Sequence, residues 1–167
     1  ENALPRPASP YGIAKYAVEQ YLEFYNQVKN LKIAILRLSN VYGPRQDPDG
    51  EAGVIAIFLN SLLRNNICKI NGQGRQTRDF IYASDIVEAN ILAMKKKEAD
   101  YNIFNVGTGT PHSIFDVAQT IINITRMNLK PRIINKFRAG DIRHCYADIT
   151  KIKNRLGFEP RVSFEEG

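Results

Sequence analysis

The chain of 167 residues is 44% hydrophobic, which is enough for the core of one domain of ordinary size. Its 23 basic and 17 acidic residues leave a net charge of +6, and the one tight basic cluster, residues 95–97, ends a predicted helix. The other cations are spread along the chain, whereas nucleic-acid-binding proteins gather them in a patch. We therefore expect no nucleic-acid partner and a preference for small anionic ligands such as phosphates.

The first predicted helix covers about residues 10–30. Ser9 is a typical N-cap residue, and the proline that follows it suits the first helical position. Apolar side chains recur at helical spacing, which predicts a broad buried face that packs on a sheet or on a partner subunit. These apolar residues are Ile13, Ala17, Tyr21, Phe24 and Val28.

Two residues near the start of this helix carry chemistry. Tyr11 and Lys15 are four positions apart, so they lie one turn apart on the same face of the helix. A free phenol ionises only near pH ~10, and a neighbouring ammonium favours the phenolate. The pair therefore predicts a base that removes a proton from a sugar alcohol. The same spacing also occurs by chance in many helices, so the assignment depends on the rest of the chain.

Further along the chain, strands and helices alternate, which is typical of an α/β domain. The apolar run at residues 32–38 predicts a buried parallel strand. Ser84 and Asp85 predict the N-cap of a helix that ends near Lys96, and Gly157 closes the last helix. The other expected elements are a helix at 54–63, strands at 68–71 and 78–82 joined by a turn at 71–75, a strand at 102–106, a helix at 113–126, a strand at 132–135 and a helix at 150–156.

A glycine-rich turn for a dinucleotide is missing from this sequence. The nearest candidate, residues 107–111, lacks the third glycine and contains a proline. The chain also begins at Glu1 without a methionine and stops at Gly167, where a new helix is starting. A catalytic-looking tyrosine without a cofactor cradle leads us to expect a fragment of a longer protein.

The cysteines and histidines exclude several other classes of protein. Cys68 and Cys145 are too few for a disulfide framework or a zinc site, and His112 and His144 are not spaced like metal ligands. We therefore expect no metal. No signal peptide or long apolar span is recognisable, so we expect a soluble cytoplasmic protein with no membrane partner.

Eight motifs, in order along the whole chain, carry a resemblance to a known family. They are residues 9–15 (SPYGIAK), 36–37 (LR), 40–48 (NVYGPRQDP), 50–58 (GEAGVIAIF), 76–82 (QTRDFIY), 104–109 (FNVGTG), 140–143 (GDIR) and 156–160 (LGFEP). At this spacing they resemble the extended short-chain dehydrogenase/reductase family of NAD-dependent epimerases and dehydratases. Within that family the likeness is to prokaryotic UDP-glucose 4-epimerases.

The resemblance implies an α/β fold: the C-terminal part of an NAD-binding Rossmann-type fold plus a small α/β domain for the nucleotide sugar. Residues 1–48 would end the dinucleotide-binding domain. Residues 49–167 would form most of the substrate domain, with about 76–95 returning to the Rossmann domain. The glycine-rich half, which is the main binding half for NAD, would precede this chain.

The resemblance also implies the reaction. The complete enzyme would catalyse NAD-dependent 4-epimerisation of a UDP-hexose, UDP-glucose or UDP-galactose, through a 4-keto intermediate. Tyr11 would act first as base and then as acid, while Lys15 holds the nicotinamide ribose. Ser39 would lie against the nicotinamide. The fragment alone would be inactive and would bind NAD poorly, because the phosphate-binding turn is absent.

The matching positions imply a site for the UDP part of the substrate. Arg78 and Arg138 would grip the diphosphate, because the planar guanidinium matches phosphate oxygens. An ion pair of Arg78 with Asp79 or a nearby acid, and a capping or turn role for Asp141, remain alternatives. The other implied contacts are Asn40, the backbone around Val54, Asn71, and Asp141 to the uridine ribose.

Cys145 falls where the family lines the sugar pocket. A bulky tyrosine at that place is associated with excluding N-acetylated sugars, and cysteine is small. We therefore expect the complete enzyme to accept UDP-N-acetylglucosamine as well as UDP-glucose. The alternative is that Cys145 is simply a small buried apolar residue.

Three other functions remain open. A nucleotide-sugar 4,6-dehydratase would need a further acid–base pair that is not in this sequence, and a decarboxylase or reductase of sugar nucleotides is a weaker match. The chain could also be a non-catalytic module that binds nucleotide sugars. The family usually forms homodimers through a four-helix bundle, to which the helix at residues 10–30 would contribute. We also expect an exposed sheet edge and exposed apolar surface.

Overall fold

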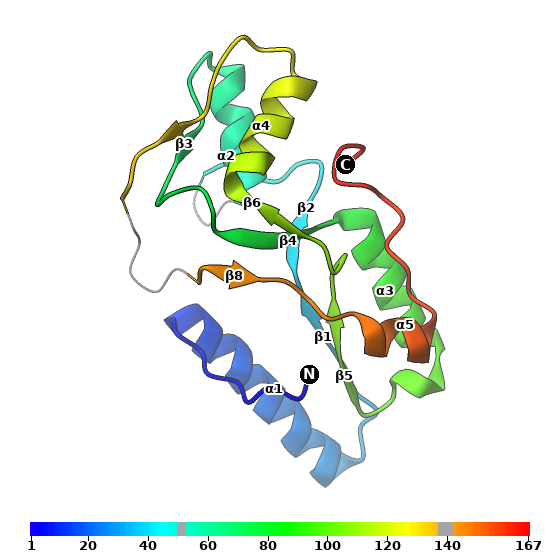
Figure 1. The fold of residues 1–167 in the computed structure, drawn as a ribbon. Helices are drawn as coiled ribbons and strands as arrows, with labels where there is room; N and C mark the ends of the chain where they lie inside the picture. The colour runs from blue at the N-terminus through cyan, green and yellow to red at the C-terminus, as the bar shows by residue number, and fades with distance from the viewer. Residues whose placement is uncertain (50–52, 137–141) are drawn as a thin grey trace.

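The structure, a computed structural model, describes residues 1–49, 53–136 and 142–167 (Figure 1). The helices are α1 (Pro10–Lys29), α2 (Val54–Leu63), α3 (Ala83–Lys95), the 3-10 turn η1 (Lys97–Ala99), α4 (Ile114–Ile124) and α5 (Thr150–Leu156). The strands are β1 (Ala34–Leu38), β2 (Asn40–Tyr42), β3 (Lys69–Ile70), β4 (Thr77–Tyr82), β5 (Asn102–Val106), β6 (Pro111–Ser113), β7 (Arg132–Ile133) and β8 (His144–Cys145). This mixture of helices and mainly parallel strands confirms the expected α/β class.

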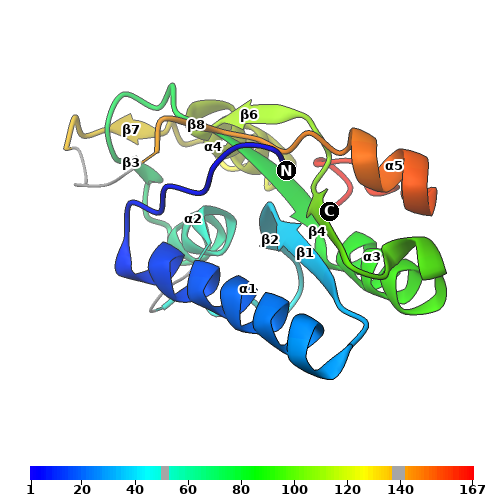
Figure 2. The same cartoon turned by 90° about the horizontal axis from the view of Figure 1, so that it is seen from below.

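Strands β1 and β5 form a parallel pair in which Leu38 lies opposite Val106. Helix α1 faces the side of this pair that carries Ile35 and Arg37. Helices α3 and α5 pack on the other side, so that α1 and α5 lie on opposite sides of the strands (Figure 2). The core on that second side contains Ile81, Ala89, Ala99, Phe104, Val106, Ile152, Leu156 and Phe158.

Strand β4 is the centre of the second sheet. It pairs with β2 and β8 in parallel and with β6 in antiparallel orientation. The chain leaves the first sheet and enters the second at Ser39, the one residue between β1 and β2. The short strands β2, β6 and β8 were not expected from the sequence, because two or three residues carry no readable alternation.

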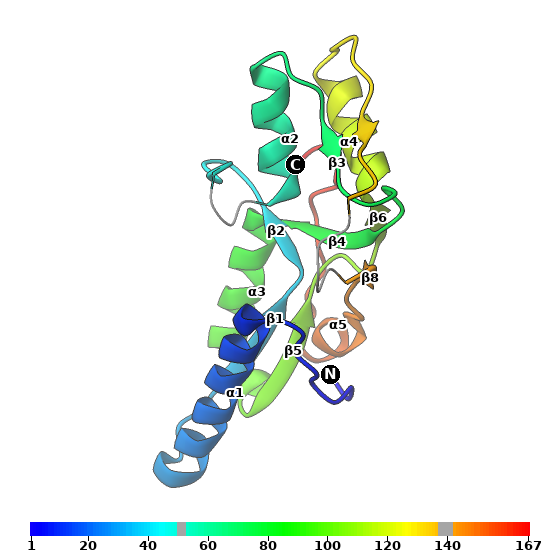
Figure 3. The ribbon, with the colours of Figure 1, turned by 90° about the vertical axis from the view of Figure 1, so that its left-hand side faces the viewer.

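A second core lies at the other end of the molecule. Helices α2 and α4 lie side by side there, with the β3–β7 pair next to them (Figure 3). Phe58, Leu62 and Ile70 are almost completely buried in this core. The full set is Tyr42, Ile55, Phe58, Leu62, Cys68, Ile70, Phe80, Ile114, Val117, Ala118, Ile121 and Ile122.

The predicted apolar face of α1 is not buried against the sheet in the part of the chain that the structure describes, and its burial against a partner subunit stays a prediction. No α1 residue is buried there, and the side chains of Tyr21 (67%) and Val28 (57%) are more than half exposed. The helix instead meets the β1–β5 strands through a more polar face that includes Tyr16 and Glu19. The apolar periodicity of the sequence identified the apolar face of α1, but it did not identify which surface covers that face.

The predicted N-cap of α3 is wrong. The N-cap residue is Tyr82, and Asp85 lies inside the first turn. The Asp85 carboxylate accepts hydrogen bonds from the backbone N–H groups of Arg161 and Val162, both at 3.2 Å. Asp85 therefore holds the C-terminal segment against α3 instead of capping the helix. No helix in the described ranges is long and apolar enough to cross a membrane.

Candidate active site

A cavity of about 340 Å³ lies where α1, the end of β1 and the start of α2 meet. Three of the predicted site residues, Tyr11, Ser39 and Asn40, line it together. Val54 begins α2 between two further lining residues. Among the described residues, the lining consists of Tyr11, Leu38, Ser39, Asn40, Val41, Tyr42, Gln46, Gly53 and Ile55. The volume lies at the lower end of the range of small-molecule sites, ~300–1,000 Å³.

Tyr11 and Lys15 have the geometry that their spacing predicts. Ser9 caps the helix by accepting a hydrogen bond from the N–H of Gly12 at 3.1 Å, so both residues lie in its first turns. The Lys15 ammonium lies 5.3 Å from the centre of the Tyr11 ring. This distance is within the range of a cation–π contact. Tyr11 is 62% exposed and lines the cavity.

Ser39 is held at the carboxyl ends of β1 and β5. Its N–H donates to the carbonyl oxygen of Val106 at 2.8 Å, and its hydroxyl donates to the Asp79 carboxylate at 3.1 Å. Ligands of open α/β sheets bind at the carboxyl ends of parallel strands. Ser39 therefore has both the place and the fixed orientation of a residue that contacts a ligand.

Arg78 and Cys145 form a second group. They lie opposite each other on β4 and β8. The Arg78 guanidinium donates to the carbonyl oxygens of Thr77 at 2.8 Å and Arg143 at 3.4 Å. Cys145 is exposed, so the alternative of a buried apolar residue is wrong. Cys68, by contrast, is buried, and this burial raises the pKa of its thiol.

The remaining predicted residues lie apart from the Tyr11 cavity or outside the described residues. Asn71 follows β3, and its carbonyl oxygen accepts a hydrogen bond from the side chain of Gln76 at 2.7 Å. Arg138 and Asp141 lie outside the described residues. Within the described ranges, no group of three His, Cys, Asp or Glu residues could hold a metal ion.

Sequence reasoning missed Asp79 as a residue of this site. It considered Asp79 only as a possible ion-pair partner for Arg78. The side chain is 1% exposed, and its carboxylate accepts hydrogen bonds from Ser39, Thr108, Gly109 and Ala147. An available signal was an acidic residue directly before the apolar residues Phe80 and Ile81 of a predicted strand, because a buried charge requires several donors.

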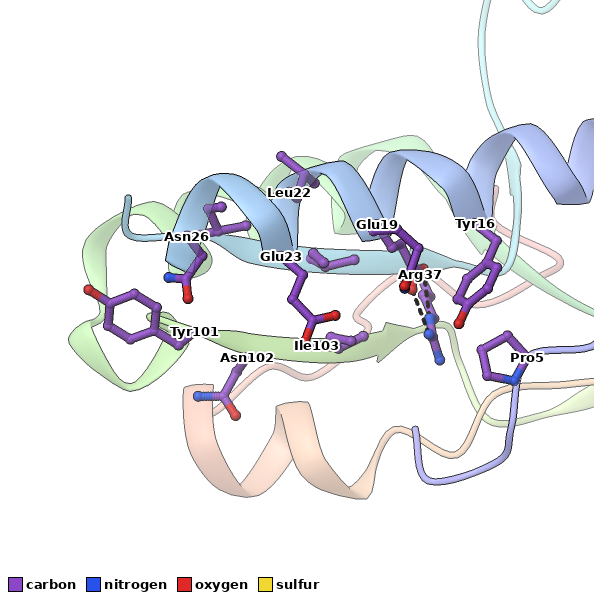
Figure 4. Close-up of a pocket in the computed structure, with 13 residues that line it drawn as sticks. Pro5, Tyr16, Glu19, Leu22, Glu23, Asn26, Arg37, Tyr101, Asn102 and Ile103 are labelled. Atoms are coloured by element: carbon purple, nitrogen blue, oxygen red, sulfur yellow. Dashed lines mark hydrogen bonds and ion pairs between the residues drawn. The ribbon is translucent and has the colours of Figure 1, made fainter. Parts of the chain in front are cut away.

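A separate cavity of about 350 Å³ lies between α1 and the β1–β5 strands (Figure 4). Arg37 and Glu19 form a two-pronged ion pair on its wall, with N–O distances of 2.8 and 2.6 Å. The hydrogen bond to Glu19 raises the pKa of Arg37. This cavity does not include the predicted catalytic residues, but the ion pair fixes α1, which carries them, to β1.

A parallel sheet with a Tyr–Lys helix beside the carboxyl ends of its strands is typical of the Rossmann-type fold of the dehydrogenase/reductase class. The chain belongs to the NAD dependent epimerase/dehydratase family, whose model matches residues 1–107. The resemblance inferred from the motifs is thereby confirmed.

Known relatives include several sugar-nucleotide enzymes. The chain is 42% identical to a putative UDP-glucose 4-epimerase of Methanocaldococcus jannaschii, over 100% of this chain and 53% of that protein. It is 33% identical to the dTDP-D-glucose 4,6-dehydratase of Homo sapiens, over 100% of this chain and 48% of that protein. The structure of the Thermotoga maritima UDP-glucose 4-epimerase with UDP-glucose superposes with a TM-score of 0.90 at 45% identity, over 100% of this chain and 55% of that chain. The chain therefore spans about half the length of these relatives.

Proposed function

We propose that the protein encoded by the complete reading frame is an NAD-dependent 4-epimerase of UDP-hexoses that works through a 4-keto sugar. The observation that carries this proposal is that Tyr11, Ser39 and Asn40 line the same cavity. Relatives named as UDP-glucose 4-epimerases, including that of Mycolicibacterium smegmatis at 39% identity over 100% of this chain and 53% of that protein, support the reaction type.

The polar groups at this cavity fit the nicotinamide end of NAD. Those on which this proposal rests are the hydroxyls of Tyr11 and Ser39, with the Lys15 ammonium one turn along the helix. NAD, when bound, supplies the acceptor and later the donor of the hydride at the sugar C4. The sequence has no glycine-rich turn for the pyrophosphate, so we infer that residues outside this chain hold the rest of the cofactor. By this proposal the chain alone is inactive.

Tyr11 moves the proton in this mechanism. Its phenolate oxygen takes the proton of the sugar 4-hydroxyl while C4 loses its hydride, which leaves a ketone at C4. The sugar then turns over, so that the opposite face of C4 accepts the hydride. As the hydride returns to C4, Tyr11 returns the proton to the oxygen. The Lys15 charge, 5.3 Å from the ring centre, stabilises the negative charge that this oxygen carries before it takes the proton and again after it has returned it.

Substrate binding requires a firm hold on the UDP part and a free sugar. We propose that Arg78 and Arg138 bind the diphosphate. We propose that Asn40, the backbone around Val54, Asn71 and Asp141 complete the nucleotide site. We propose two parts, a dinucleotide part (residues 1–48 and about 76–95) and a substrate part (most of 49–167). Two separate apolar cores support a division in two, and the core that contains Ile81 and Ala89 also includes Phe104, Ile152 and Leu156 from the range given to the substrate part.

Cys145 bears on the choice of sugar. Its side chain is small and exposed, and it lies opposite Arg78. We propose that this leaves room for an acetamido group, so that UDP-N-acetylglucosamine is also a substrate. A Cys145→Tyr variant should lose activity on the N-acetylated sugar and keep it on UDP-glucose. Equal activity of this variant on both sugars would contradict the role of Cys145.

The test of the function is direct. The protein expressed from its complete reading frame is supplied with NAD and with UDP-glucose or UDP-N-acetylglucosamine, and the C4 epimers are measured. Turnover of either sugar supports the epimerase. A 4-keto-6-deoxy product would instead identify a 4,6-dehydratase, the activity named for the human relative. Absence of both products would leave a nucleotide-sugar-binding protein without the proposed catalysis.

Two properties of the complete protein follow from the same proposal. We propose a homodimer that covers the exposed apolar face of α1, which includes Tyr21 and Phe24. Sedimentation of the complete protein, compared with a Tyr21→Glu variant, tests this assembly, and a monomeric wild-type protein would contradict it. We also propose a cytoplasmic location, which fractionation of cells tests.

A further inference from the structure

Asp79 lies at the centre of the most highly connected polar cluster around the candidate site. Its carboxylate is buried, with 1% of the residue exposed. One oxygen accepts from the N–H of Thr108 at 2.9 Å and from its hydroxyl at 2.6 Å. The other accepts from Ser39 Oγ at 3.1 Å, from Gly109 N at 3.0 Å and from Ala147 N at 3.2 Å. A buried anion is stable only with such a set of donors.

These donors come from three segments that are far apart in the sequence. Ser39 joins β1 to β2, Thr108 and Gly109 follow β5, and Ala147 follows β8. Ser39 lines the cavity of Tyr11, whereas Ala147 lies two residues beyond Cys145, which is paired with Arg78. One side chain therefore connects the cofactor side of the proposed site to its sugar side.

The turn at residues 107–109 is shaped around this carboxylate. A Cβ atom at Gly107 would collide with Asp79 Oδ2 and with Ser39 Oγ, and it would lie 2.9 Å from Ala147 Cβ. Gly109 has a φ of +74°, a conformation that glycine adopts without strain. The two backbone N–H groups of Thr108 and Gly109 converge on an anion, as in the backbone concavities that bind phosphates. Here the anion is a side chain of the same protein.

We propose that Asp79 is a positioning residue for the reaction: it sets the distance between the nicotinamide side and the sugar side of the site. The inference rests on the proposed function. Asp79 does not touch the reacting atoms in this account. It acts through Ser39 on one side and through the segment from Cys145 to Ala147 on the other.

The variant Asp79→Asn tests this role without a change of size. An amide presents one acceptor and one N–H₂ group. If the N–H₂ replaces Oδ1, it meets the N–H of Thr108, and if it replaces Oδ2, it meets those of Gly109 and Ala147. Neither orientation satisfies all the donors, so at least one of the connected segments must move.

Asp85→Asn is a matched control. Asp85 is also buried, at 4% exposure, and each of its oxygens accepts one backbone N–H, from Arg161 or Val162. In the Asp85→Asn variant, the side-chain N–H₂ group would likewise face a backbone N–H group in either orientation. Asp85 holds the C-terminal segment and lies outside the proposed catalytic machinery. A merely structural role of Asp79 would give the same result for the two variants.

The experiment uses the complete enzyme with NAD. We expect both variants to lower the melting temperature. Asp79→Asn should also lower kcat by about 10²-fold, the effect of a misplacement of about 1 Å, with little change in KM. Reduced nicotinamide, seen by its fluorescence, should accumulate during turnover in this variant alone. Hydrogen exchange should become faster at residues 108, 109 and 147, and Asp85→Asn should keep the wild-type kcat.

A milder variant covers the case in which Asp79→Asn does not fold. Thr108→Val keeps the size of the side chain and removes the hydroxyl's hydrogen bond to Asp79, together with the exposed one that the hydroxyl accepts from the N–H of Thr110. We expect it to lower kcat about tenfold, the kinetic equivalent of one charged hydrogen bond. A kcat that falls equally in the Asp79 and Asp85 variants, or a Thr108→Val enzyme as active as wild type, would overturn the positioning role. A wild-type enzyme without epimerase activity would instead overturn the proposed function itself.

Discussion

Helix α1 and strand β4 carry the two parts of the proposed chemistry, and they are held in different ways. Against the other described residues, α1 has no buried side chain, and the Arg37–Glu19 ion pair is its principal polar link to β1. Strand β4 buries Asp79, Phe80 and Ile81, each at 3% exposure or less. Tyr11, the group proposed to transfer the proton, thus lies on the less supported element, and Asp79, the proposed positioning residue, lies on the more supported one.

This difference indicates where each element obtains its rigidity. Asp79 collects donors from segments on both sides of β4, so the described residues alone can fix it. The position of Tyr11 depends on a few polar contacts and on whatever covers the apolar face of α1. Substitutions in the two regions should therefore separate effects on the chemistry from effects on folding.

The largest expected effect is on the reaction itself. Tyr11→Phe in the complete protein removes the proposed proton acceptor and should lower kcat about 10³-fold with little loss of stability, because Tyr11 is 62% exposed. Tyr21→Phe removes a hydroxyl from the same helix, at 67% exposure, and is the control. Steady-state kinetics of the two variants give the comparison. Equal activity of both would remove Tyr11 from the mechanism.

The next effect concerns packing around Asp79. Gly107→Ala places a methyl group against Asp79 Oδ2 and Ser39 Oγ, which should cost about 2–3 kcal/mol of unfolding free energy. In α1, the added methyl group of Gly12→Ala contacts only the exposed residues before the helix, with Pro7 Cβ at 3.2 Å. This variant should gain about 0.5–1 kcal/mol of stability, because alanine has a higher helix propensity than glycine. In denaturant unfolding, the midpoint should therefore fall for Gly107→Ala and rise for Gly12→Ala. A harmless Gly107→Ala would contradict the close packing described for this turn.

The long elements were predictable from the sequence because their signals are local. The Ser9 cap and the left-handed Gly157, with a φ of +64°, bound α1 and α5 as expected, and α4 begins directly after Ser113, where the helix was predicted to start. Periodicity likewise indicated an apolar face on α1. Nothing in a periodic pattern identifies the surface that packs against such a face, so its exposure was not predictable.

The Asp79 cluster was not predictable because it is entirely non-local. Its donors lie 29 to 68 residues away in the sequence. The glycine-containing turn at residues 107–109 failed as a dinucleotide motif, and its actual partner is a carboxylate on another strand. The Tyr11, Ser39 and Asn40 grouping was expected only from family resemblance. Their common cavity follows from the crossing of β1 into β2, which the sequence does not reveal.

A smaller effect is expected for the ion pair that attaches α1 to β1. Glu19→Gln removes the charge partner of Arg37, and both side chains are partly buried, at 16% and 28% exposure. The loss of these charged hydrogen bonds should lower the unfolding free energy by about 2 kcal/mol. Glu159→Gln breaks the exposed pair with Lys153, at 2.9 Å, and should have no measurable effect. Equal midpoints for both variants would show that the Arg37 pair does not hold α1.

The smallest expected effect concerns the stability that Tyr42 in β2 contributes, and it appears only at alkaline pH. Burial raises the pKa of Tyr42 to about 12, above the ~10 of a free tyrosine. The unfolded chain therefore ionises first, so this stability is complete below pH ~10 and is lost as the pH rises toward 12. Tyr42→Phe should have a shallower decline over that window, and Tyr21→Phe should follow the wild type. Identical slopes for all three proteins in denaturant titrations at several pH values would contradict the burial of an un-ionised Tyr42.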